Sequence, residues 1–137
     1  MSEHETTAPA YLRLHHAAVT HPVGGEDRMR EFYGGVLGLT EVQKPETMDR
    51  TKGCWFRHDG IELHTIPDPE FHPAGVGHPA ILVDDLDALI ARLEVAGVAV
   101  EPDDRFPGHR RLHAHDFFGN RLEFLQPLPA HEERRPR

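Results

Sequence analysis

Hydrophobic and polar residues along the chain form short alternating stretches and two stretches with helical spacing. Residues 11–20 alternate, which predicts a strand, and one of its faces would carry Leu12, Leu14, His16 and Ala18. Apolar residues recur at helical spacing in two places: Met29, Phe32, Tyr33 and Val36, then Leu86, Leu89, Ile90 and Leu93. Further short strands are predicted at residues 39–43, 53–57, 61–66, 78–83, 98–102, 110–116 and 121–126.

Turn and capping signals support these boundaries. Gly38 and Gly97 are well placed to end the two helices. The pair Asp59 and Gly60 is typical of a hairpin turn. Before the second helix, Asp84 or Asp85 is expected to accept hydrogen bonds from the free N–H groups of the first turn. The predicted elements therefore define an α+β protein.

The order of elements repeats. Residues 11–66 and residues 77–126 each follow the order strand, helix, strand, strand, strand, with residues 67–76 as a linker rich in proline and glycine. One such unit alone would bury too little apolar surface to be stable. We therefore expect two paired βαβββ modules that form a cupped mixed sheet with the helices outside. The ends of the chain, residues 1–10 and 127–137, are expected to be disordered.

Histidine and glutamate occupy matching places in the two halves. His16 precedes Glu62 by 46 positions, and His78 precedes Glu123 by 45. If all four side chains point into the cup, two imidazoles and two carboxylates converge, a set that suits Zn²⁺, Ni²⁺, Mn²⁺ or Fe²⁺. His64 shares a strand face with Glu62 and could replace it as the fourth ligand.

Other residues are candidates for a substrate pocket. Trp55 and Arg57 lie together on a predicted strand, where they either pack in the core or face the cup, and there Arg57 could bind a substrate anion. Arg111, His113 and His115 share one face of a later predicted strand. This face is either exposed at a sheet edge or turned toward the cup. In the cup, His113 would be a candidate proton carrier.

Composition narrows the class of protein. The chain has 137 residues, 28% of them charged, and a formal net charge of −8, so a nucleic-acid partner is not expected. No apolar run reaches the roughly 18 residues of a membrane span, and residues 1–5 lack the pattern of a secretory signal, so we expect a cytoplasmic protein. Cys54 is the single cysteine and forms no internal disulfide. Open sheet edges favour a homodimer.

Four stretches carry a resemblance to a known family. They are residues 31–39 (EFYGGVLGL), 60–64 (GIELH), 78–87 (HPAILVDDLD) and 116–123 (DFFGNRLE). With them, the chain resembles the vicinal oxygen chelate superfamily, which includes glyoxalase I, bleomycin-resistance proteins and extradiol dioxygenases. The resemblance covers residues 11–127 and does not select one activity within the superfamily.

The resemblance implies paired βαβββ modules around a metal. His16, His78 and Glu123 map onto the ligands that recur in metal-dependent members. Glu62 maps onto the additional ligand of glyoxalase I-like members, whereas dioxygenase-like members have three ligands. Drug-sequestering members without a metal usually lack the histidines.

These observations lead to one expected function and one alternative. We expect an enzyme that uses a divalent metal to activate a small oxygen-containing substrate. With Glu62 or Glu123 as both ligand and base it would be a lyase or isomerase, and with Fe²⁺ and three ligands a ring-cleaving dioxygenase. The alternative is a metal-free protein that binds or sequesters a small molecule.

Overall fold

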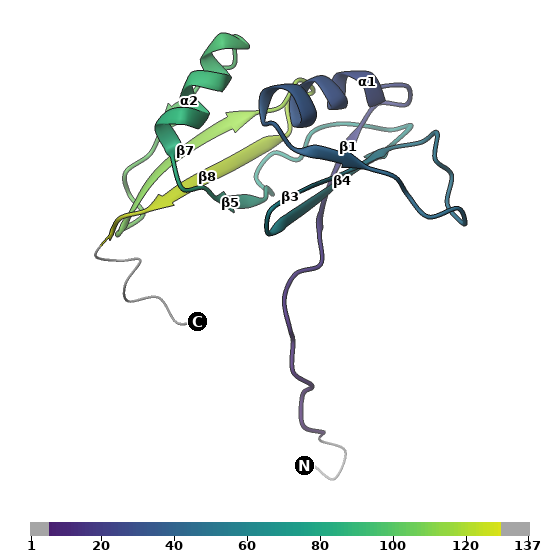
Figure 1. Ribbon diagram of the computed structural model, residues 1–137, viewed down its shortest axis with the longest axis horizontal. Helices are drawn as coiled ribbons and strands as arrows, with labels where there is room; N and C mark the ends of the chain where they lie inside the picture. Colours follow the sequence, from purple (N-terminus) through teal and green to yellow (C-terminus); the bar gives the residue numbers. More distant parts are fainter. Residues whose placement is uncertain (1–5, 130–137) are drawn as a thin grey trace.

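The computed structural model describes residues 6–129, which form two four-stranded sheets with the helices on one side of them (Figure 1). The elements in chain order are β1 (Ala17–His21), α1 (Glu26–Met29), η1 (Arg30–Val36), β2 (Thr40–Val42), β3 (Cys54–His58), β4 (Ile61–Pro67), β5 (Ala80–Leu82), α2 (Leu86–Val95), β6 (Glu101–Pro102), β7 (His109–His115) and β8 (Arg121–Pro127). The predicted α+β class is confirmed.

The two sheets have the same topology. Their strand orders are β1-β4-β3-β2 and β5-β8-β7-β6. In each sheet the first strand runs parallel to the last, and the other pairings are antiparallel. The repeat predicted from the sequence is therefore a repeat of sheet topology. The two sheets do not close into a barrel. The helices lie on one side of each sheet, and we call the other side its open face (Figure 1). No helix among residues 6–129 is long and apolar enough to cross a membrane.

The first strand is shorter than predicted. It begins at Ala17, because pairing with β4 starts there, and a strand needs a hydrogen-bonded neighbour. Residues 6–16 instead run away from the sheets (Figure 1), and Leu12 and Leu14 are almost fully exposed. The disorder expected for both ends of the chain stays a prediction, since residues 1–5 and 130–137 lie outside the described part.

The helical predictions are confirmed, with one difference in geometry. Met29, Phe32 and Tyr33 are completely buried, as the apolar spacing predicts. After Met29 the helix widens into the π-helical segment η1, which ends in a hydrogen bond from Leu37 N to Phe32 O over five residues (2.9 Å). At α2, the side chain of Asp85 accepts a hydrogen bond from Ala88 N, so Asp85 is the N-cap.

A buried carboxylate joins the two halves. Asp116 Oδ2 accepts a hydrogen bond from Tyr33 Oη (2.7 Å), and Asp116 also accepts bonds from Asn120 Nδ2 and from the backbone N–H groups of Phe118 and Asn120. Asn120 Nδ2 donates a second bond to Thr20 O in β1. Burial and the nearby charge of Asp116 raise the pKa of Tyr33, so its hydroxyl stays a donor. The turn between β7 and β8 is thereby fixed to the first half.

We predict that this contact is a main source of stability. Asp116→Ala leaves buried donors unpaired and should lower the free energy of unfolding by about 3–5 kcal/mol. Tyr33→Phe removes one bond to a charged acceptor and should cost about 1.5–3 kcal/mol. Urea denaturation measures both, with the exposed Asp84→Ala as the matched control. A Tyr33→Phe protein as stable as the control would contradict this account.

Candidate metal centre

The β7–β8 hairpin brings together two of the groups in the site. In β8, Leu122 and Phe124 face the core under α2, so Glu123 between them faces the open side of the sheet. The register pairs Glu123 with His113 in β7. Both polar side chains are nevertheless buried, with 6% and 3% of their surface exposed. Buried polar groups need partners, so their surroundings decide what they can bind.

His78 approaches the same carboxylate from the segment before β5. Its Nδ1 lies 2.7 Å from Val76 O, and its Nε2 lies 2.7 Å from Glu123 Oε1. Both partners are acceptors, so either both ring nitrogens carry protons or a cation takes the place of the proton on Nε2. A histidine whose Nδ1–H donates to a backbone carbonyl while Nε2 faces the site is the usual arrangement of a metal ligand.

His113 completes a set of three. Its Nε2 lies 3.8 Å from Glu123 Oε1, and this buried atom has no hydrogen-bond partner among residues 6–129. One ligand atom each from His78, His113 and Glu123 lies within 4.8 Å of the others. Among residues 6–129, this is the one set of three or more histidine, cysteine or carboxylate groups with that spacing.

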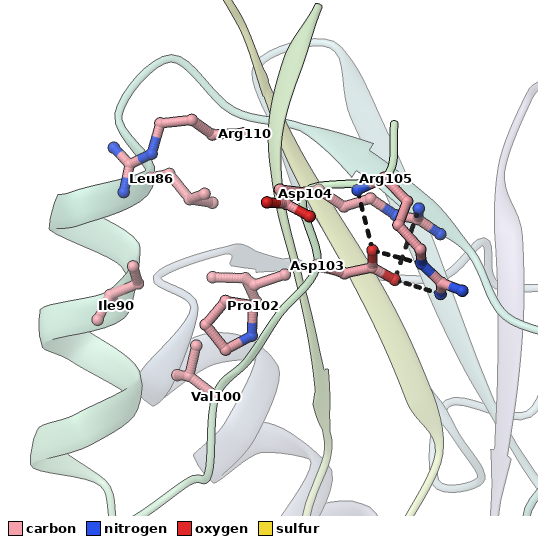
Figure 2. Close-up of a pocket in the computed structure, with 10 residues that line it drawn as sticks. Leu86, Ile90, Val100, Pro102, Asp103, Asp104, Arg105 and Arg110 are labelled. Carbon is pink, nitrogen blue, oxygen red and sulfur yellow. Dashed lines mark hydrogen bonds and ion pairs between the residues drawn. The ribbon is translucent and has the colours of Figure 1, made fainter. Parts of the chain in front are cut away.

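The second oxygen of Glu123 has its own partner. Arg111 Nε lies 2.9 Å from Glu123 Oε2, and the same guanidinium lies 3.7 Å from Asp103 Oδ2. Asp103 is in turn held by two hydrogen bonds from the side chain of Arg105. Figure 2 shows the carboxylate of Asp103 turned toward Arg105 and away from Leu86 and Ile90 of α2. The chain of charges leaves Glu123 Oε1 directed at the two histidines.

These surroundings set the charge states. Burial would raise the pKa of Glu123, but the hydrogen bond from His78 and the charge of Arg111 outweigh it and lower the pKa. Burial, with the positive charges of Arg121 and Arg111, lowers the pKa of His113. The site therefore holds an ionised carboxylate beside a neutral imidazole near pH 7, which is the state in which both bind metals.

The matching place in the first half is filled by protein contacts. Glu62 Oε1 lies 2.9 Å from Arg57 Nε, and Glu62 Oε2 lies 2.8 Å from His64 Nε2. The ring of His64 is stacked between Trp55 (4.1 Å between centroids) and His16 (3.8 Å). Both oxygens of Glu62 are thus engaged, and these groups form no set of three with metal-binding spacing.

The expected convergence of four ligands is therefore not found within this chain. The structure brings His78 to Glu123 and places His16 on His64 beside Glu62, but it does not unite these two sets. The reason is that each set belongs to one sheet, and the sheets are separate. Whether His16, Glu62 and His64 are ligands stays a prediction.

The predicted pocket residues also divide between the two sets. Trp55 and Arg57 lie with Glu62, and Arg111 and His113 lie with Glu123. A cavity of about 550 Å³ borders His78, between β1, the segment before β5 and the start of β8. None of the four predicted pocket residues lines this cavity.

Sequence reasoning missed two residues next to the site. Arg121 lies two positions before Glu123 in β8, and the alternation of strand side chains could have placed it on the same face. Asp103 lies in the connection after β6, where no periodic signal exists, so only the structure identifies it as the partner of Arg111.

We predict a pH dependence of stability from the first-half contacts. Burial lowers the pKa of His64, so the stability that its neutral form provides should be complete above about pH 6.5 and fall as the pH drops below it. The hydrogen bonds from His64 and Arg57 lower the pKa of Glu62 to about 2, so a second loss should follow between about pH 4.5 and 2.

Thermal melting of the metal-free protein from pH 8 to 5 measures the first loss. His64→Gln should make this part of the curve flatter, whereas His115→Gln, which changes an exposed histidine, should not. Equal slopes in the wild type and His64→Gln would contradict the assignment.

The comparisons with known proteins agree with the observed topology. The family model described as the Glyoxalase/Bleomycin resistance protein/Dioxygenase superfamily matches residues 13–124. No curated protein matches the chain significantly.

Solved structures show the same fold. A protein of Bacillus anthracis described as belonging to the glyoxalase family is 35% identical, with 88% of this chain and 99% of that chain covered and a TM-score of 0.83. A mutant of the fosfomycin resistance protein FosX from Listeria monocytogenes, solved with Mn(II) and a dihydroxypropylphosphonic acid, is 16% identical (92% and 100% covered, TM-score 0.72). Lactoylglutathione lyase from Agrobacterium tumefaciens is 22% identical (88% and 96% covered, TM-score 0.63). The repeated topology and these matches show that the chain belongs to the glyoxalase/bleomycin resistance protein/dioxygenase superfamily.

Proposed function

We propose that this protein is an enzyme that uses a divalent metal to activate a small oxygen-containing substrate. The observation that supports it most is the set of His78, His113 and Glu123, in which one ligand atom of each residue lies within 4.8 Å of those of the others. Superfamily members use divalent metals, and the FosX structure from Listeria monocytogenes contains Mn(II). Imidazole and carboxylate ligands fit Zn²⁺, Ni²⁺, Mn²⁺ or Fe²⁺.

The residues present fit such an ion. His113 Nε2 is buried without a partner, a cost that a metal would remove. His78 faces two acceptors, so a cation can replace the proton on its Nε2. Glu123 would bind through Oε1, since Arg111 holds Oε2. A bound metal would supply Lewis acidity to a substrate oxygen.

The protein groups would orient the substrate and handle protons. His78 keeps its orientation through Val76 O, and Arg111 holds Glu123 ionised, so the carboxylate can accept a proton from a bound substrate. Glu62 is the second candidate base. Its contacts with Arg57 and His64 keep it ionised too, but on the other sheet.

The reaction class depends on how many ligands the metal has. If Glu62 joins the set, proton transfer in a lyase or isomerase fits best. With two histidines and one carboxylate, the set also matches the ligands of Fe²⁺ oxygenases, which fits a ring-cleaving dioxygenase. The identity of the metal in protein purified without a tag or chelator separates these two classes.

A metal-free binding protein is the second candidate. The observation in its favour is the first-half cluster, where Glu62 and His64 are satisfied by protein groups and Trp55 offers an aromatic surface. A binding protein of this kind would bind its small molecule with the same affinity after divalent metals are removed.

The open sheet faces favour a homodimer. Ile66 and Leu82 project from the faces away from the helices and are 49% and 47% exposed. A second copy that covers these faces could bring its His16 and Glu62 to the His78 and Glu123 of the first. We expect sedimentation to give a dimer at micromolar concentration and Ile66→Asp to weaken it. A wild-type monomer would contradict this arrangement.

We predict that metal affinity depends on the three-residue set. In titrations with Mn²⁺, Zn²⁺, Ni²⁺ and Fe²⁺, Glu123→Gln and His113→Leu should each weaken binding of the preferred ion by about 100-fold, because each removes a ligand atom. The matched control is His115→Gln, on the same face of β7 but exposed, which should bind as the wild type does.

Two outcomes would count against parts of this proposal. Unchanged metal affinity in Glu123→Gln would show that His78, His113 and Glu123 do not form a metal centre. Full affinity in Glu62→Ala would leave the three-residue set but would show that Glu62 is not a fourth ligand.

A further inference from the structure

An arginine that has no partner within the described part of the chain borders the candidate metal centre. Arg121 is the first residue of β8 and lies two positions before Glu123, so both side chains emerge on the same face of the sheet. Arg121 is half-buried, yet it forms no hydrogen bond or ion pair with any residue in the range 6–129. Its charge is felt by His113, whose pKa it lowers.

The other half-buried arginines behave differently. Within the part of the chain that the structure describes, Arg30, Arg111 and Arg121 are the arginines of intermediate exposure. Arg30 pairs with Glu41 and Asp27, and Arg111 pairs with Glu123 and Asp103. Removing a cation from water is costly unless an anion compensates it. Arg121 is therefore the half-buried arginine whose counter-charge the described chain does not supply.

The surroundings of Arg121 suit a small ligand. Arg121 and His78 line the same cavity of about 550 Å³. Much of the remaining wall consists of small apolar side chains, among them Ala17, Ala18 and Pro79. The net charge of the chain is −8, so a local cation is needed if an anion is to be held here.

We infer that the site selects small anionic substrates, with Arg121 as the residue that binds their carboxylate or a similar oxyanion. This inference rests on the proposed function, in which another oxygen of the substrate lies at the His78, His113 and Glu123 set. Residues two apart in a strand have Cα atoms about 6.6 Å apart, so a molecule of a few heavy atoms can span both groups. Short 2-hydroxy and 2-oxo acids have this chemistry, and guanidinium binds carboxylates in a bidentate manner.

The experiment compares an acid with its neutral amide. Glycolate and glycolamide have nearly the same size, and both are titrated calorimetrically into protein with and without Mn²⁺. Arg121→Gln should weaken glycolate binding at least tenfold and change glycolamide binding less than twofold. Arg121→Lys should recover part of the glycolate affinity. Arg110→Gln is the control, because Arg110 lies toward the other end of the β7–β8 hairpin and pairs with Asp87 on the side of α2 (Figure 2).

The outcomes separate this inference from the proposed function. A loss of glycolate affinity specific to Arg121→Gln supports the anion site even if Mn²⁺ does not bind, a result that would overturn the metal-dependent function alone. Equal effects of Arg121→Gln on both ligands, no effect on either, or no detectable glycolate binding by the wild type would overturn the anion site even if Mn²⁺ binds.

Discussion

The buried carboxylate of Asp116 is the contact on which both the fold and the site depend. It accepts four hydrogen bonds, one of them from Tyr33 in the other half, and so fixes the turn between β7 and β8 against the first sheet. That turn sets the register in which His113 lies opposite Glu123. A slip of one residue would turn Glu123 into the apolar core, so the chemistry of the open face relies on this turn.

The two halves share a topology, but they compensate the charge of the glutamate on their last strand in different ways. In the first half, Arg57 and His64 pair with both carboxylate oxygens of Glu62. In the second, Arg111 takes one oxygen of Glu123 and His78 approaches the other, while His113 Nε2 stays without a partner. A buried polar atom left unpaired is costly, and functional sites are where such costs are commonly found. Among residues 6–129, the set with metal-binding spacing therefore lies on the second sheet.

Much of the architecture could be predicted from the sequence because it follows from local periodicity. The buried face of Met29, Phe32 and Tyr33 and the cap at Asp85 are confirmed. Two other expectations depended on information about strand and sheet pairing, which local periodicity does not contain. Residues 11–16 alternate without a neighbouring strand, and matched spacing of His16 and Glu62 with His78 and Glu123 does not show which sheets face each other. The position of Arg121 beside the site could have been predicted from the alternation of strand side chains alone. The position of Asp103 could not, because it depends on the conformation of a loop.

The central claim is that His78, His113 and Glu123 hold a divalent metal. Anomalous diffraction from crystals grown with Mn²⁺, recorded on both sides of its absorption edge, locates the ion directly. The account predicts one strong peak within bonding distance of His78 Nε2 and Glu123 Oε1 and next to His113 Nε2. A metal bound only elsewhere, or a site in which His78 still contacts Glu123 directly at saturating Mn²⁺, would contradict it.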